Sequence, residues 1–463
     1  MIVHKFGGTS VGSADRFGNV AAIIMEQQRR TAGRGLAVVV SAMSGVTSQL
    51  VAGARSAAAG RDTEYRAVKA HLLERHLAVV DALLDRAPER LDVAGLVEDR
   101  LHDVERLYRS IAVLGEVTVR GLDAVASTGE QLSVHILAAV LRSRGLRAQA
   151  VSAVELVVTD DHFGAAAPLM EATRERLEGR IRPLIERGVV PIVTGFIGAT
   201  KTGIPTTLGR GGSDYTAAIL GAGLGAEEVW IWSDVDGILT ADPNIVGHAR
   251  TLAELSYQEA ANLAYFGADV LHPKTIRPVI ESGIPLRIRN SLNPEHPGTL
   301  IVARPDPTRQ HRPAIISTAG LAMIAIGTED DSWTLQMAAG ALQHLSEAGI
   351  DVLMFSQSFS EHSLNLVVRQ DEQSHCVNVL NRQMSNGCQL GTTERVATVS
   401  VVGMPGYNKN GIVPHAFGAL GKHGTRVIAV AQAATEHSVS FCIPEDQVAE
   451  TVRFLHRELG LET

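Results

Sequence analysis

The chain opens with the stretch Met1-Ile-Val-His-Lys-Phe-Gly-Gly-Thr-Ser10, in which an apolar segment runs directly into two glycines. A second apolar run, Leu36-Ala-Val-Val-Val-Ser41, follows a segment over residues 14–31 whose apolar positions recur at helical spacing. Short apolar runs bounded by glycine or small polar residues are typical of buried strands in parallel sheets. The opening therefore predicts a strand, a helix and a second strand, with Lys5 delivered near the end of the first strand.

The same alternation continues for nearly 300 residues. Further strands are expected at 147–151, 189–194, 228–233 and 285–289, and helices at 46–58, 63–86, 92–112, 123–143, 168–187, 213–222, 256–264 and 272–282. Strands that alternate with helices indicate a three-layer α/β domain with a mainly parallel sheet. We assign this domain to residues 1–300, because five prolines between residues 293 and 313 then indicate a linker or domain edge.

The C-terminal part contains an internal repeat. Gln357-x-x-x-Glu361-His-Ser recurs 75 residues later as Gln432-x-x-x-Glu436-His-Ser, and the order strand, helix, strand, strand, helix is expected twice. The pattern favours two small α+β domains, at 314–391 and 392–463, over a chance similarity between two amphipathic hairpins.

Composition excludes several classes of protein. Apolar residues make up 45% of the 463 residues and charged residues 20%, which is typical of a chain with large buried cores. The net charge of −8 argues against nucleic acid as a partner. Three widely spaced cysteines indicate a reducing compartment. No membrane partner is expected, because no apolar run approaches the 18 residues of a span, and without a signal peptide we expect a cytoplasmic location.

Two glycine-rich turns carry the chemistry. Lys5-Phe-Gly7-Gly8 lets the backbone approach a ligand closely, and N–H groups at the following helix start favour an anion. Leu208-Gly-Arg210-Gly-Gly-Ser213-Asp214 opens a helix and offers a guanidinium fork suited to a carboxylate or phosphate. Taken singly, each could be an ordinary turn, with a solvated arginine in the second.

A third polar turn, Ser233-Asp-Val-Asp-Gly237, follows a predicted strand. Its spacing does not fit a calcium loop of the EF-hand type, which needs a later glycine and a terminal glutamate. Polar turns at the carboxyl ends of strands in open α/β sheets are, however, where ligands bind.

Together these motifs resemble the aspartate kinase family in order and spacing. The resemblance rests on the three turns above and on four further motifs: Ser127-Thr-Gly-Glu130, Gly195-Phe-Ile-Gly198, Tyr265-Phe-Gly-Ala-Asp-Val-Leu-His-Pro273 and Asn290-x-x-Asn-Pro-x-x-Pro-Gly-Thr299. It covers essentially the whole chain. The duplicated tail resembles the paired ACT domains (ferredoxin-like amino-acid-binding units) of that family.

The resemblance implies an amino-acid-kinase α/β/α sandwich that transfers the γ-phosphate of ATP to the β-carboxylate of L-aspartate. This is the first step toward lysine, threonine and methionine. Lys5 and Asp214 are the implied catalytic residues, and the aspartate-binding residues are Thr47, Glu130, Arg210 and Ser213. The implied nucleotide-binding residues are Lys5, Gly7, Gly8, Ser233, Asp234, Leu239, Asn244 and Lys274. The cofactor is MgATP, with Mg²⁺ held by the phosphates rather than by protein ligands.

The sequence departs from the commonest family pattern at three positions. Asp269 stands where many members have a lysine, and Leu239 and Asn244 replace a tyrosine and an arginine near the nucleotide. Lys274 or Lys201 could supply replacement charge. We therefore expect a weaker affinity for ATP than is typical.

For the tail, the resemblance implies that Gln357, Glu361, Gln432 and Glu436 bind a feedback amino acid, with threonine favoured over lysine. It also implies a homodimer or higher oligomer through the ACT domains, which could alternatively be the tail's only role. Another amino-acid kinase, such as an acetylglutamate or glutamate kinase, would lack the full motif set and this tail. A catalytically silent amino-acid-binding regulator is the second alternative. No homoserine dehydrogenase segment is expected, because the chain ends at Thr463 after the second repeat.

Overall fold

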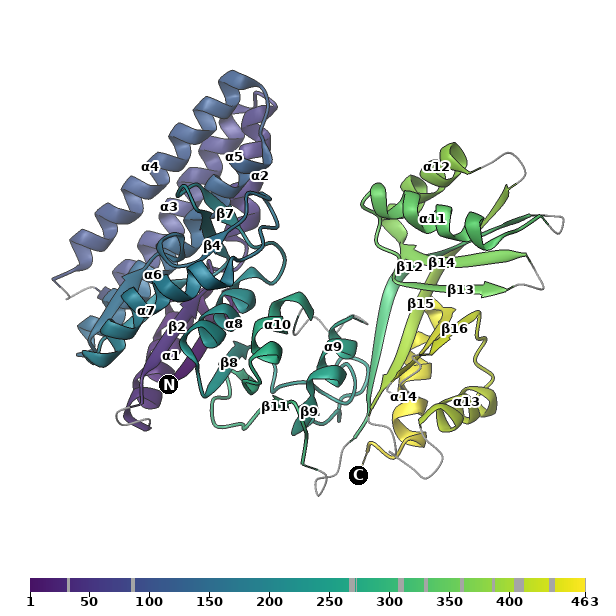
Figure 1. Cartoon of the computed structure of the whole chain (residues 1–463). Coiled ribbons are helices and arrows are strands. Elements are labelled where there is room, and N and C mark those ends of the chain that lie inside the picture. Colours follow the sequence, from purple (N-terminus) through teal and green to yellow (C-terminus); the bar gives the residue numbers. More distant parts are fainter. Residues whose placement is uncertain are drawn as a thin grey trace. The chain divides into compact units, whose positions relative to one another are not determined.

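The computed structural model describes residues 1–30, 34–84, 88–265, 271, 273–306, 312–328, 332–358, 362–384, 388–403, 412–432 and 438–462. The chain divides into two compact units (Figure 1). The first unit contains Met1–Ile238, Ala253–Tyr257 and Val270–Pro305, and the second contains Leu239–Leu252, Gln258–Asp269 and Asp306–Thr463. This division differs from the expected one, because two segments within residues 1–300 belong to the second unit.

The first unit is built on an eight-stranded sheet in the order β3-β5-β2-β1-β8-β10-β11-β9. The strands are β1 (Ile2–Phe6), β2 (Leu36–Val40), β3 (Ala148–Val151), β5 (Val190–Thr194), β8 (Glu228–Ser233), β9 (Glu254–Ser256), β10 (Leu286–Asn290) and β11 (Thr299–Val302). The pairing between β10 and β11 is antiparallel, and all other pairings are parallel. Every residue of β1 and β2 is buried, so the mainly parallel, centrally buried sheet is confirmed.

Helices cover both faces of this sheet. The α-helices of the first unit are α1 (Ala14–Arg30), α2 (Val46–Ala58), α3 (Asp62–Leu84), α4 (Arg90–Leu114), α5 (Val119–Ala126), α6 (Thr128–Ser143), α7 (Met170–Glu186), α8 (Gly212–Leu224) and α10 (Pro273–Glu281). α1 and α6 pack together on one side, whereas α7 and α8 pack together against β5 and β1. A helix of three or four turns with one apolar face must bury that face, and the sheet supplies the partner surface.

The helix expected at residues 123–143 is wrong in one respect, because the structure has two helices there. Thr118 caps α5 by accepting a hydrogen bond from the Gly121 N–H, and the chain bends at Ser127 before α6 begins. Val119–Ser143 is apolar and long enough to cross a membrane, but 83% of its apolar window is buried, as in the core helices of globular proteins.

A small sheet was not predicted from the sequence. It contains β4 (Val158–Thr159), β6 (Ile197–Thr200) and β7 (Pro205–Thr207). These strands have two to four residues, too few to show a periodicity of two in the sequence. The end of β7 leads directly into the glycine-rich loop around Arg210.

The second unit is a six-stranded antiparallel sheet in the order β13-β14-β12-β15-β17-β16. Its elements are β12 (Ala314–Thr328), α11 (Leu335–Glu347), β13 (Met354–Ser358), β14 (Ser363–Arg369), α12 (Gln373–Gln383), β15 (Cys388–Val402), α13 (Ile412–Lys422), β16 (Ala429–Gln432), β17 (Ser438–Pro444) and α14 (Val448–Glu458). Strand, helix, strand, strand, helix therefore occurs twice, as predicted. α9 (Tyr257–Tyr265) is the remaining α-helix among the described residues.

The expected boundary between residues 391 and 392 lies inside a strand. β12 and β15 are each 15 residues long and pair along most of their length. The C-terminal half of β12 pairs with β14. The first residues of β12 pair with the part of β15 that also pairs with β17. The two repeated units therefore share continuous strands, a connection that similarity between repeats does not predict.

Candidate active site

Lys5 lies near the carboxyl end of the central strand β1. β1 is hydrogen-bonded in parallel to β2 on one side and to β8 on the other, with Lys5 opposite Val39 and Ile231. Because parallel strands end at the same edge of a sheet, the turn after β1 and the turn after β8 begin side by side. At Gly8, any Cβ atom would lie 2.9 Å from the carbonyl oxygen of Ala42, which follows β2, so the close approach of the turn after β1 to the turn after β2 requires glycine.

The loop around Arg210 supplies the partner of Lys5. Gly211 adopts a left-handed conformation with φ of 69°, after which α8 begins with Gly212, Ser213 and Asp214 in its first turn. Asp214 Oδ1 lies 2.6 Å from Lys5 Nζ, and the two side chains are only 15% and 11% exposed. The ion pair therefore joins the two glycine-rich turns predicted to act together.

Lys5 and the Arg210 loop border one pocket of about 470 Å³. Its lining residues are Lys5, Ser41, Thr47, Glu130, Phe196, Gly209, Arg210, Gly211, Gly212, Ser213 and Asp214. Every residue that the resemblance assigned to catalysis or to aspartate is among them. The first turn of α8 also borders the pocket, and helix N-termini favour negatively charged groups through their unpaired N–H donors.

Glu130 is the most strongly perturbed group in this pocket. Its side chain is 3% exposed, and one carboxylate oxygen has no hydrogen-bond partner among the described residues. Burial raises the pKa of Glu130 to about 8, although backbone hydrogen bonds at Ala42 and at Glu130 itself act in the opposite direction. A buried carboxyl group with an unused oxygen is suited to a cationic ligand group, which would favour its ionised form.

The turn after β8 forms a second polar surface at the same sheet edge. Ser233 Oγ lies 3.2 Å from Asp234 Oδ1, and Asp236 accepts hydrogen bonds from the side-chain amides of Asn290 (2.9 Å) and Asn293 (3.1 Å). A Cβ atom on Gly7 would lie 3.4 Å from Lys5 Nζ and 3.7 Å from the Trp232 carbonyl oxygen. The glycine turn thus adjoins both Lys5 and the start of this surface.

The remaining predicted nucleotide residues are not in the lining of this pocket. Lys274 is exposed in the first turn of α10. Leu239 and Asn244 belong to the second unit, where Leu239 pairs with Thr251 and Asn244 bonds to Asp242. Asp269 lies outside the described residues.

The predicted effector residues are only partly described. Gln357 lies in β13, and its buried amide nitrogen has no hydrogen-bond partner in the described part of the chain. Gln432 ends β16 and is exposed. Glu361 and Glu436 lie outside the described residues.

Asp123 is a positioning residue that sequence reasoning missed. It lies in α5, is 3% exposed, and accepts hydrogen bonds from the Thr207 N–H (3.0 Å), the Thr207 hydroxyl (2.7 Å) and the Gly164 N–H (2.9 Å). These bonds fix the end of β7, from which the Arg210 loop departs. No motif marks it, because an isolated aspartate in a helical pattern reads as solvated.

We expect Asp123→Ala to lower the free energy of unfolding by about 3 kcal/mol, because it leaves buried donors without an acceptor. It should also raise the KM for the acceptor substrate by displacing the Arg210 loop. Asp123→Asn, which keeps one accepting oxygen, should restore part of both losses. Denaturant unfolding and steady-state kinetics measure the two effects, and an unchanged KM in Asp123→Ala would contradict the positioning role.

Phe196 is a pocket residue to which the sequence analysis assigned no role. Its φ is 69°, and its N–H donates to the Thr216 hydroxyl at 3.0 Å, which holds a conformation that is unfavourable for a bulky residue. A Cβ atom on Gly212 would lie 2.7 Å from the Phe196 ring. Phe196 therefore packs directly against the first turn of α8.

Protein-family models match most of the chain. Residues 1–290 match the amino acid kinase family, and residues 334–384 and 399–459 match the ACT domain. Aspartokinase 1 (chloroplastic) of Arabidopsis thaliana is 34% identical over 469 residues, covering 98% of this chain and 79% of the relative. The bifunctional aspartokinase/homoserine dehydrogenase 1 (chloroplastic) of the same plant is 34% identical over 99% of this chain. The chain spans 51% of the length of that bifunctional relative.

Solved structures give the same result. The crystal structure of Escherichia coli aspartokinase III in complex with aspartate and ADP has a TM-score of 0.82 and 29% sequence identity, with 99% of both chains covered. The complex of that enzyme with lysine and aspartate has a TM-score of 0.81 at the same identity and coverage.

Proposed function

Since the chain belongs to the aspartokinases of the amino acid kinase family, we propose that its pocket binds L-aspartate and transfers the γ-phosphate of MgATP to the β-carboxylate. The products are 4-phospho-L-aspartate and ADP. The observation that carries the proposal is the convergence of Lys5, Asp214, Arg210 and Glu130 on one pocket.

Different pocket residues contact the two ends of the substrate. Glu130 accepts hydrogen bonds from the α-ammonium group with its unused oxygen, and Arg210 pairs with the α-carboxylate. Thr47 and Ser213 add hydroxyl groups to the same lining. With both α-groups held, the β-carboxylate is directed toward Lys5.

Lys5 stabilises negative charge and does not act as a general base. The β-carboxylate is already ionised at neutral pH, given a reference pKa near 3.9, so no proton needs to be removed before attack. The obstacle is the approach of two anions. The ammonium group of Lys5 and the N–H groups of the Gly7–Gly8 turn offset that repulsion, while Asp214 holds Lys5 in place. MgATP enters as the co-substrate and lies along the Ser233–Asp234 turn.

An acceptor-dependent assay of ADP release tests the proposal. L-Aspartate should stimulate ADP release, whereas L-glutamate, N-acetyl-L-glutamate and buffer should not. Stimulation by a glutamate derivative would indicate another amino-acid kinase. Absence of ADP release with every acceptor, from protein that still binds aspartate, would indicate a silent regulator.

We further propose that the second unit binds a free amino acid that inhibits the enzyme. The buried amide nitrogen of Gln357, which has no hydrogen-bond partner among the residues that the structure describes, supports this, and the related Escherichia coli enzyme was crystallised with lysine. Threonine is the effector that the sequence favours, and lysine is the one that this relative suggests. Homo-oligomer formation through the ACT units and a cytoplasmic location remain part of the proposal.

Calorimetric titration with lysine and with threonine should give heat for one of them. Gln357→Ala should raise the dissociation constant of that effector about tenfold or more, because it removes a buried hydrogen-bond donor to the ligand. Gln343→Ala, which removes an exposed glutamine paired with Glu347 on α11, is the matched control and should change nothing. Heat from neither amino acid would contradict the sensor role.

A further inference from the structure

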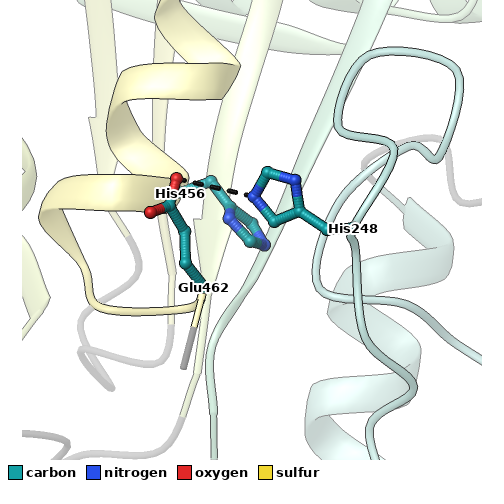
Figure 2. Close-up of side chains that lie close together, drawn as sticks. All are labelled: His248, His456 and Glu462. Carbon is teal, nitrogen blue, oxygen red and sulfur yellow. Dashed lines mark ion pairs between the residues drawn. The ribbon is translucent and has the colours of Figure 1, made fainter.

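Three side chains from two separate segments converge within the second unit (Figure 2). His248 belongs to the segment Leu239–Leu252, His456 lies on α14, and Glu462 follows the end of that helix. Each offers one ligand atom, and the three atoms lie within 4.8 Å of one another. His248 Nε2 and Glu462 Oε1 are 3.5 Å apart.

His456 provides the independent sign of a ligand site. Its side chain is fully buried, and Nε2 lies 3.0 Å from the hydroxyl oxygen of Thr240. The second ring nitrogen, Nδ1, has no hydrogen-bond partner within the described ranges of the chain. Histidines that bind metals typically hold one ring nitrogen on an oxygen and use the other for the metal. The Thr240 contact leaves Nδ1 available in this way.

Hydrogen bonds from arginine side chains to backbone carbonyl oxygens already join the two segments. The Arg250 guanidinium donates to the Glu462 carbonyl oxygen at 2.9 Å, and Arg453 Nε donates to the Ile245 carbonyl oxygen at 3.1 Å. Within the 239–252 segment itself, the N–H of Thr240 donates to the Arg250 carbonyl oxygen at 2.8 Å. The framework is therefore preformed, and only exposed side chains need to move to complete a coordination sphere.

We propose that His248, His456 and Glu462 bind a divalent transition-metal ion, with zinc as the best match. Two imidazoles and one carboxylate are a zinc ligand set, and tetrahedral zinc places its ligands about 3.3 Å apart. The His248–Glu462 separation of 3.5 Å is close to that value. The ligand atoms that lie farther apart, within the limit of 4.8 Å, can come closer because the side chains of His248 and Glu462 are 61% and 44% exposed. Solvent supplies the fourth ligand, and the bound ion links the 239–252 segment to the end of α14.

The simpler alternative is a surface ion pair beside a buried histidine. An exposed pair of this kind contributes little to stability and has no preference for a metal. A metal site should bind zinc with an affinity that depends on His248 and Glu462. A surface ion pair should not bind zinc.

Calorimetric titration of the full chain with zinc chloride separates them. The protein should carry no histidine tag and be stripped with a chelator beforehand. We expect saturable binding of one zinc ion per chain, weakened about tenfold or more in His248→Ala and in Glu462→Gln. His344→Ala is the matched control, because it removes another histidine–glutamate pair of the second unit (3.7 Å) and should leave the affinity unchanged.

Thermal unfolding gives a second measurement that does not depend on activity. Zinc should raise the unfolding temperature of the wild-type chain but not that of His248→Ala, because a ligand that binds only the folded state stabilises it. Millimolar magnesium should not compete, since it prefers an octahedral set of oxygens. Absence of saturable zinc binding, an unchanged wild-type affinity for zinc in both ligand variants, or displacement of zinc by magnesium would overturn the proposal.

Discussion

Lys5→Ala should lower kcat by about 100-fold to 1,000-fold, the range typical when a preorganised donor to transition-state charge is lost. The structure gives the reason, because Lys5 is the cation that β1 delivers between the two glycine-rich turns and pairs with Asp214 at 2.6 Å. Since aspartate is held by other groups, its dissociation constant should change much less than kcat. Rapid-quench and steady-state kinetics, with binding measured separately by calorimetry, resolve the two effects.

Removing Lys5 also leaves Asp214 without its partner, so loss of stability must be distinguished from loss of catalysis. Lys69→Ala is the matched control, because Lys69 and Glu105 form another largely buried ion pair in the first unit, at 3.5 Å. It should leave kcat near the wild-type value, because neither Lys69 nor Glu105 lines the pocket. Near-normal turnover in Lys5→Ala would refute the catalytic role.

Glu130→Gln should lower kcat/KM for aspartate by about 10-fold to 100-fold, which is the loss expected for one hydrogen bond to a charged group. The effect should lie mainly in KM, because Glu130 holds the α-ammonium group rather than the reacting carboxylate. Glu105→Gln alters a carboxylate of similarly low exposure outside the pocket and should leave KM unchanged.

The pH dependence follows from the raised pKa of Glu130, which is about 8. Aspartate binds best to the ionised form, so kcat/KM should rise as the pH increases from 6 to about 8, and Glu130→Gln should lose this rise. The same shift affects stability. Because the pKa of Glu130 is higher in the folded state, the folded state binds the proton of this carboxyl group more tightly than the unfolded state does. The stabilising effect of the neutral form is complete below the unfolded pKa and is lost as the pH rises through 8.

Glu130→Gln should therefore be more stable than the wild type at alkaline pH, by up to several kcal/mol at roughly 1.4 kcal/mol per pKa unit. Denaturant unfolding at two pH values measures this difference. A wild-type kcat/KM that does not vary over that pH range, or a variant that loses stability at alkaline pH, would contradict the electrostatic role of Glu130.

The sequence predicts the centre of the first unit well. The five-residue stretch Ile2–Phe6, which contains Lys5 and runs into two glycines, has few folded solutions other than a buried parallel strand and a tight turn. The ligand-binding character of the Arg210 loop could also be predicted, because glycines before the start of a helix expose backbone N–H donors. Their meeting through Lys5 and Asp214 was expected from the family resemblance, and the geometry agrees.

Other features depend on contacts between residues far apart in the sequence. Asp123 lies 84 residues before Thr207, and its role becomes visible only when α5 lies beside β7. The assignment of Leu239–Leu252 to the second unit follows from Ala241 and Val246, which pack into the core that contains Phe441 and Leu455. Local patterns carry no signal for such long-range packing.

The most direct test of the account is the identity of the carboxylate that receives the phosphate. The protein is incubated with L-aspartate, MgATP and hydroxylamine, and the trapped hydroxamate is identified by mass spectrometry against authentic α- and β-isomers. Because Arg210 and Glu130 hold the α-groups while Lys5 faces the side chain, the β-hydroxamate should be the product. The α-hydroxamate, or ADP release without any hydroxamate, would contradict it.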